Sequence, residues 1–137
     1  MLCAAPAIAD PQVDYMLHCR GCHGPNGEGA PGAAPVMRGQ VGKFLSAPGG
    51  REYLIRVPGT AQSELDDART AALLNWILRQ FSPDELPPDF TPYSAAEVTR
   101  HRHPPLTDVV AVRRELMRAI QAREASAAPG THRTSSP

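Results

Sequence analysis

The stretch Cys19-Arg20-Gly21-Cys22-His23 decides how the rest of this sequence is interpreted. Two residues separate the cysteines, so both sulfurs can reach one edge of the same planar group, and a histidine follows directly. A Cys-x-x-Cys-His run is typical of covalent haem attachment, in which each thiol adds across one vinyl group of the haem. The spacing therefore predicts one haem c bound through Cys19 and Cys22, with His23 as an axial ligand of the iron.

Three other interpretations fit these five residues taken alone. A zinc site needs four ligands, usually as two separated pairs, and the second pair on offer is His101 and His103, beyond a proline-rich stretch. A thioredoxin-like redox pair requires a βαβ context, and no segment beside the cysteines alternates as a strand. The third interpretation is a chance pair of cysteines beside a histidine. Only the surrounding sequence can decide among them.

The composition indicates a small helical protein. Its 137 residues include 15 prolines and 11 glycines, which favours short helices joined by irregular loops. No segment alternates as a strand, so the predicted fold class is all-α. Aromatic residues make up only 5%, and a core so poor in large rings gains from an apolar cofactor. The formal net charge is zero, so nothing predicts binding to nucleic acid, and no apolar run is long enough to cross a bilayer.

Apolar periodicity and capping residues predict the helices. Asp10 can cap the first helix, on which Val13, Met16 and Leu17 share a face, and Ser94 opens a capping box. The last helix, capped by Thr107, is expected either to pack its apolar stripe on the rest of the chain or to dock a partner. Helices are expected over residues 10–23, 51–57, 66–81, 94–102 and 107–123, with a single turn over 41–45.

The two ends of the chain differ from its middle. Residues 2–9 are small and apolar, and Ala7-Ile8-Ala9 before Asp10 matches a signal-peptide cleavage site, which predicts an exported, periplasmic protein. From Pro83 onward proline-rich spacers alternate with helical patterns, and the last residues are small and polar. The predicted organisation is a signal-peptide remnant over 1–9, a haem domain over 10–82, a helical extension over 83–125 and a disordered tail over 126–137.

The residues around the motif resemble the class I c-type cytochromes over about 10–81. Tyr15 lies four positions before the first cysteine, where that family has an aromatic residue, and Gly24 follows the histidine as is usual there. Residues 73–81 are similar to the family's terminal helix, and Trp76 would contact Tyr15 where this helix crosses the first one. The resemblance implies a small cytochrome c-like helical domain around one covalently bound haem.

The resemblance also implies roles for individual residues. The segment 34–39 looks like the family's Pro-x-Leu-x-Gly stretch, in which the proline carbonyl accepts the N–H of the iron-bound histidine. By that resemblance Pro35 fixes the tautomer of His23. The family is one of electron carriers, not enzymes, so the expected partner is a redox protein: a dehydrogenase, an oxidase or another cytochrome.

One family feature is missing from this sequence. The family supplies a methionine as the second axial ligand from the loop before its last helix, and here residues 57–65 contain neither methionine nor histidine. Met37 is the candidate for the distal ligand, although it also suits a flexible core filler. His101, His103 and Gln62 are further candidates, and otherwise the iron is open to small ligands. The predicted function is a periplasmic electron carrier or the cytochrome subunit of a dehydrogenase, and the alternative is a haem-based ligand-binding or sensor protein.

Overall fold

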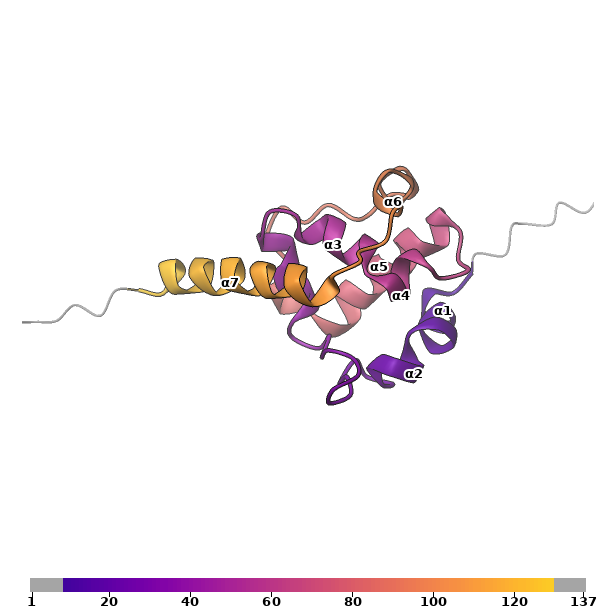
Figure 1. Ribbon diagram of the computed structural model, residues 1–137, viewed down its shortest axis with the longest axis horizontal. Helices are drawn as coiled ribbons and strands as arrows, with labels where there is room; N and C mark the ends of the chain where they lie inside the picture. Colours follow the sequence, from indigo (N-terminus) through magenta and orange to yellow (C-terminus); the bar gives the residue numbers. More distant parts are fainter. Residues whose placement is uncertain (1–8, 130–137) are drawn as a thin grey trace, which may run out of the picture.

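The computed structural model describes residues 9–129, which fold into helices joined by loops (Figure 1). The elements, with η marking 3-10 helices, are α1 (Pro11–His18), α2 (Arg20–His23), η1 (Val41–Ser46), α3 (Gly50–Arg56), α4 (Pro58–Ala61), α5 (Asp67–Phe81), η2 (Pro83–Glu85), α6 (Ala95–His101) and α7 (Val109–Ala127). No strand forms among these residues, so the predicted all-α class is confirmed. The predicted signal-peptide remnant lies almost wholly outside the described residues.

The observed helices follow the predicted ones closely, with several differences. The first helix breaks at Cys19, where the backbone leaves helical geometry before α2 begins. The expected helices do not include the short helix α4, which begins at Pro58 directly after α3. Proline is equally suited to the first position of a new helix, since its missing N–H is not needed there. Finally, Asp108 caps α7 in place of Thr107, and its carboxylate accepts a hydrogen bond from the amide of Ala111 at 2.9 Å.

The core forms where α1 crosses α5. Tyr15 is 1% exposed, and its ring centroid lies 5.3 Å from that of Trp76 and 5.1 Å from that of Phe81. The predicted contact between Tyr15 and Trp76 is confirmed. Burial raises the pKa of Tyr15 to about 12, and its hydroxyl donates to the carbonyl of Gly24 at 2.6 Å. One side chain thus joins α1 to α5 and fixes the residue that follows the cysteine–histidine motif.

The apolar face of α1 points to solvent. Val13, Met16 and Leu17 are 47%, 50% and 71% exposed, whereas the neighbouring Asp14 and Tyr15 are buried. Asp14 is held inside by an ion pair with Arg69 of α5, so the charge is compensated where it is buried. An exposed apolar face of this kind is unusual for a short amphipathic helix and marks a surface available for contact.

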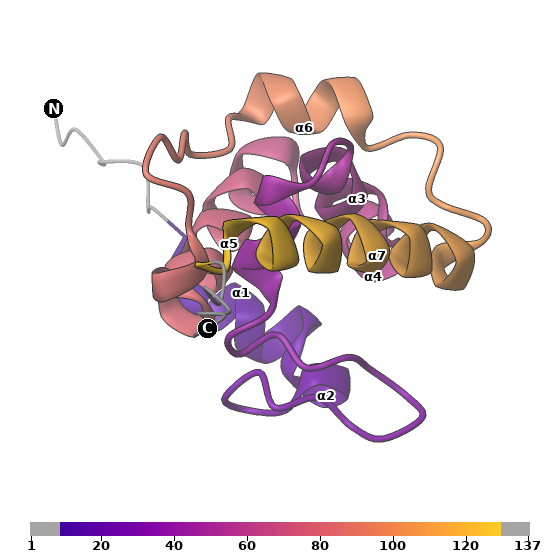
Figure 2. The same ribbon diagram turned by 90° about the vertical axis from the view of Figure 1, so that its left-hand side faces the viewer.

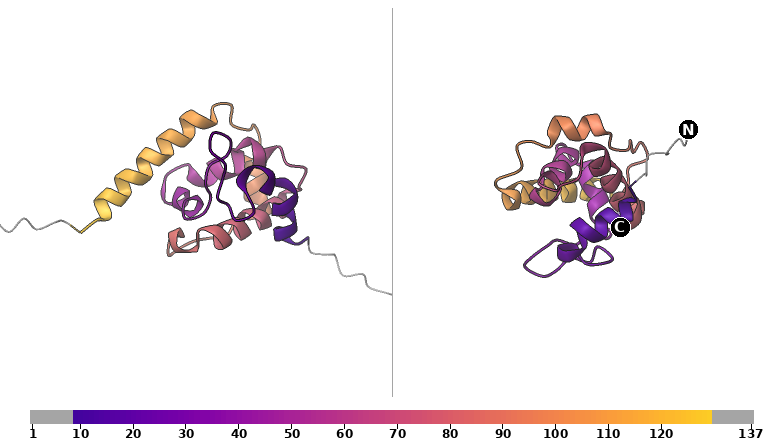
Figure 3. Two further views of the ribbon diagram at one scale, coloured as in Figure 1. Left: turned by 90° about the horizontal axis from the view of Figure 1, so that it is seen from below. Right: turned by 90° about the vertical axis from the view of Figure 1, so that its right-hand side faces the viewer.

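Residues 83–127 fold back onto the rest of the chain. Helix α6 lies across α5 and α3, and α7 begins beside α3 and runs along η1 (Figure 2). Tyr93, Val98, Leu116 and Ile120 are buried in the same core cluster as the residues of α1 and α5. Figure 3 shows the last turns of α7 reaching past the body of the molecule, where Lys43 pairs with Glu124 at 2.9 Å.

Arg102, directly after α6, closes the turn between α4 and α5. Its side chain is buried, and its guanidinium donates to the carbonyls of Ala61 at 2.9 Å, Leu65 at 2.7 Å and Ser63 at 2.6 Å. It also pairs with the carboxylate of Asp67 at 2.9 Å. No other hydrogen bond reaches these three carbonyls within the described residues, so Arg102 satisfies several backbone acceptors of this turn at once.

Replacing Arg102 with leucine is expected to lower the free energy of unfolding by about 3 kcal/mol, because several buried acceptors lose a charged donor together. Denaturation by guanidinium chloride, followed by circular dichroism, measures this. Arg100→Leu is the matched control, since Arg100 is exposed on α6 two residues before Arg102, and its effect should stay below about 0.5 kcal/mol. Equal effects of the two substitutions would contradict the role assigned to Arg102.

Candidate cofactor site

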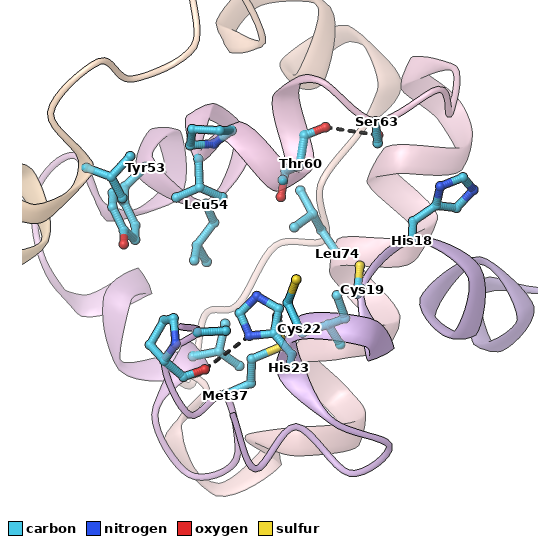
Figure 4. A pocket seen from close by; sticks show the side chains of 18 of the residues that line it. His18, Cys19, Cys22, His23, Met37, Tyr53, Leu54, Thr60, Ser63 and Leu74 are labelled. Carbon is cyan, nitrogen blue, oxygen red and sulfur yellow. Dashed lines mark hydrogen bonds between the residues drawn. The ribbon is translucent and has the colours of Figure 1, made fainter. Parts of the chain in front are cut away.

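A hollow of about 340 Å³ lies between the cysteine–histidine motif and helices α3 and α4 (Figure 4). Cys19, Cys22 and His23 lie on one wall, and Leu54 and Thr60 face them from the other. Leucines and Ile77 of α5 form the back, so the lining is largely apolar. This volume falls within the range of roughly 300–1,000 Å³ typical of ligand sites. A second hollow of about 750 Å³, beside α7, shares Pro35 and Tyr53 with the first.

The break between α1 and α2 positions the motif. Cys19 lies at the break, and its carbonyl accepts hydrogen bonds from the amides of Cys22 at 3.2 Å and His23 at 3.0 Å. This single turn brings residues three positions apart onto one side, so both sulfurs line the same hollow. Both cysteines are free thiols. Two thiols and an imidazole therefore share one wall.

His23 is oriented by a backbone carbonyl. Its Nδ1 lies 3.0 Å from the carbonyl oxygen of Pro35. A carbonyl can only accept, so Nδ1 carries the proton and Nε2 keeps a lone pair that can bind a metal. The structure forms the contact that the family resemblance implies. Such a hydrogen bond raises the basicity of a metal-binding imidazole and holds its ring in place.

The loop after the motif returns Pro35 to His23 through a tight turn at Gly29. The amide of Gly29 donates to the carbonyl of His23 at 2.8 Å, and its backbone is left-handed, with φ of +73°. A Cβ atom at this position would lie 2.7 Å from the carbonyl oxygen of Ala34. Glycine is therefore required here for two reasons: the left-handed backbone angle and the close approach of the loop segment that contains Ala34.

Met37 lies on the same side of the hollow as His23. Its amide donates to the carbonyl of Gly27 at 2.8 Å, within the loop that carries Pro35. Figure 4 places its side chain beside the imidazole and not on the facing wall. It is partly buried against the core cluster. The other three candidates do not line the hollow: Gln62 and His103 are exposed, and His101 lies on α6.

The facing wall was not predicted from the sequence. It consists of residues from α3 and α4, together with the segment between α4 and α5: Tyr53, Leu54, Val57, Pro58, Gly59, Thr60 and Ser63. Val109 and Arg113 of α7 reach the same hollow, and the guanidinium of Arg113 lies 5.5 Å from the ring centre of Phe44. These residues form no motif, so only a correct placement of α4 and α7 could have identified them.

The residues present fit a covalently held haem. An apolar hollow suits the macrocycle, two thiols suit its vinyl groups, and the free Nε2 of His23 suits its iron. Thr70 of α5 also lines the hollow. Within residues 9–129, its hydroxyl is the one fully buried side-chain polar atom without a hydrogen-bond partner. Such atoms are rare in native cores unless a bound group or water contacts them.

The two thiols differ in their surroundings. Burial raises the pKa of Cys19 to about 11, and the nearby carboxylate of Asp14 raises it further by disfavouring a second negative charge. Cys22 is exposed. Since the thiolate is the reactive form, the folded chain without haem protects Cys19 and presents Cys22.

Two proteins named cytochrome c-552, both from Thermus thermophilus, are similar to this chain. One is 36% identical over 132 aligned positions, which take in 82% of this chain and 88% of the relative. The other is 36% identical over 118 positions, covering 72% of this chain and 90% of the relative. Because 82% of 137 residues is fewer than 132, the first relative has residues in the aligned region without a counterpart here. No protein-family model matches the chain.

In the haem-free protein, iodoacetamide at pH 8 should modify Cys22 at least about tenfold faster than Cys19, because a pKa of about 11 leaves roughly one Cys19 thiol in a thousand ionised. Mass spectrometry of the peptides measures both rates. In guanidinium chloride the difference should disappear. A faster reaction at Cys19 in the folded protein would contradict the assigned burial.

Proposed function

The chain belongs to the class I mono-haem c-type cytochromes, and from this we propose that it carries single electrons through one haem c held by Cys19, Cys22 and His23. The observation that carries the proposal is the hydrogen bond between His23 and Pro35 beside a hollow that both thiols line. It leaves the Nε2 lone pair of His23 available for iron. Cys19 and Cys22 would form the thioether bonds, and Pro35 would hold the ligand in position.

The residues around the hollow suit electron transfer. When bound, the haem supplies the Fe(III)/Fe(II) couple. The carbonyl of Pro35 would hold the proton on Nδ1 of His23 while the haem is oxidised or reduced, so that no proton would have to move with the electron. The apolar side chains of Leu54, Leu74 and Ile77 line the hollow and would keep water from a bound haem, which would reduce the rearrangement of solvent that accompanies a change of charge.

We further propose a periplasmic location and a protein redox partner. The cleavage-like residues 7–10 support export. Within residues 9–129, no helix combines the length and apolar character needed to cross a membrane. The partner would be a dehydrogenase, an oxidase or another cytochrome, and the chain could serve such a dehydrogenase as its cytochrome subunit. We propose that residues 10–82 hold the haem and that 83–125 fold with them as one unit, supported by their shared core.

The exposed face of α1 is the proposed contact surface for that partner. Val13, Met16 and Leu17 lie just before Cys19, whose thioether would mark the nearest edge of the haem. Apolar side chains at this edge can be desolvated by a partner at little cost, which brings the two redox centres close together. We call this set the α1 patch.

Covalent attachment is tested by producing the chain with a haem-attachment system. The native chain should give a pyridine haemochrome of the c type and should retain haem on a denaturing gel. Cys19→Ser with Cys22→Ser should abolish both results, because no thioether can form. Cys3→Ser, outside the described residues, is the control and should change neither. Haem that acidified acetone extracts from the native chain would overturn the proposed function.

The α1 patch is tested by electron self-exchange between ferrous and ferric copies of the chain, measured by NMR line broadening. Leu17→Glu should slow the exchange by about tenfold, because two like charges then meet at the contact. Val110→Glu is the matched control, since Val110 is equally exposed but lies on α7, and it should leave the rate unchanged. An unchanged rate for Leu17→Glu would place the contact elsewhere.

A further inference from the structure

The wall that faces His23 offers the iron no strong ligand. Among the described residues, those that line it are aliphatic, glycine, proline, hydroxyl-bearing or phenolic, and none is methionine, histidine or lysine. Tyr53 is the remaining group with some affinity for iron. A phenol binds iron as the phenolate, and burial shifts the pKa of Tyr53 above its ordinary value, which disfavours that form.

Arg102 fixes this wall in place. Its guanidinium donates to the carbonyls of Ala61, Ser63 and Leu65, so the segment that connects α4 to α5 is fastened along its length. The hydroxyl of Ser63 accepts a further bond from Arg102 at 3.2 Å and donates to the carbonyl of Thr60 at 2.9 Å. Gln62 on this segment is therefore held with its side chain toward solvent.

The same anchoring holds the two histidines of the extension away from the hollow. His101 and His103 are the immediate neighbours of Arg102, whose side chain is buried behind the wall. Leu106 follows shortly and donates its amide to the carbonyl of Arg56 at 2.9 Å, while Arg56 donates to the carbonyl of Pro104 at 3.0 Å. This stretch is thus attached at one end to the segment between α4 and α5 and at the other end to Arg56 of α3.

Thr60 projects from α4 into the hollow, opposite His23 (Figure 4). Its hydroxyl makes no hydrogen bond within the part of the chain that the structure describes, while its carbonyl is used by Ser63. A side-chain hydroxyl on the facing wall can donate to the outer atom of a small molecule bound to iron. A neutral donor of this kind favours bound ligands that carry partial negative charge.

We propose that the haem iron of this chain keeps the coordination position opposite His23 open for a small exogenous ligand of the diatomic or cyanide class, with Thr60 as its hydrogen-bond donor. The inference rests on the proposed function, since it requires the haem. Binding forms one coordination bond from a lone pair of the ligand to iron. No electron is transferred, and Thr60 keeps its proton.

The test uses the haem-containing full chain, reduced with dithionite and titrated with carbon monoxide under an optical spectrometer. We expect a high-spin ferrous spectrum that converts within seconds of mixing. Thr60→Met supplies a side chain that can bind iron from the facing wall. If the methionine occupies the position in about 99 of 100 molecules, the apparent affinity for carbon monoxide falls about 100-fold, and the reduction potential rises.

Two further variants separate the roles of the residues. Thr60→Val, matched in shape, should bind carbon monoxide as the native chain does but ferric cyanide about fivefold more weakly, the effect of one lost hydrogen bond. Met37→Leu should leave the spin state unchanged. A low-spin native spectrum that becomes high-spin in Met37→Leu would overturn the inference and identify Met37 as the ligand.

The outcomes for this inference and for the proposed function are distinct. A c-type haemochrome together with a low-spin ferrous spectrum and no reaction with carbon monoxide would overturn only the open position. Equal cyanide affinity in Thr60→Val and the native chain would overturn the role of Thr60. A chain that attaches no haem would overturn both proposals.

Discussion

The burial of Tyr15 between α1 and α5 is the constraint on which the rest of this structure depends. Its ring packs against Trp76 and Phe81, and its hydroxyl holds the carbonyl of Gly24. Because Gly24 follows His23 directly, the packing of one core side chain sets where the motif ends and the loop begins. The loop then turns at Gly29 and brings Pro35 under the imidazole. The packing of Tyr15 in the core is therefore connected, through hydrogen bonds along the loop, to the orientation of the His23 imidazole.

The sequence predicts the near wall of the site well and the far wall poorly, for a physical reason. Cys19, Cys22 and His23 are close in sequence, so their spacing alone defines their geometry. The helices were predictable because apolar periodicity and capping are also local signals. The far wall depends on α4, whose single turn is too short to show periodicity. It also depends on Arg102, which binds three backbone carbonyls. A sequence pattern of side chains does not predict such contacts.

The extension has a structural part in the site itself. Its buried arginine satisfies backbone carbonyls in the turn before α5, the segment from which the family resemblance implies a second axial ligand. Burying several backbone carbonyls lowers the stability of the fold unless a donor forms hydrogen bonds with them, and Arg102 is such a donor. In α1 the usual distribution of polar and apolar side chains is reversed. Asp14 is buried with its partner Arg69, and apolar side chains are exposed to solvent. Hydrophobicity alone could not have assigned these positions.

The position of α7 has a consequence for how the molecule is assembled. Val109 and Arg113 border the hollow, yet they lie far along the chain from Cys19 and Cys22. During synthesis from the N-terminus, the attachment motif emerges long before the helix that borders the hollow. The thiols can therefore meet their cofactor while one side of the hollow is still missing, and the docking of α7 completes the enclosure afterwards. The position of one helix in the sequence thus leaves room for haem attachment to precede the closing of the hollow.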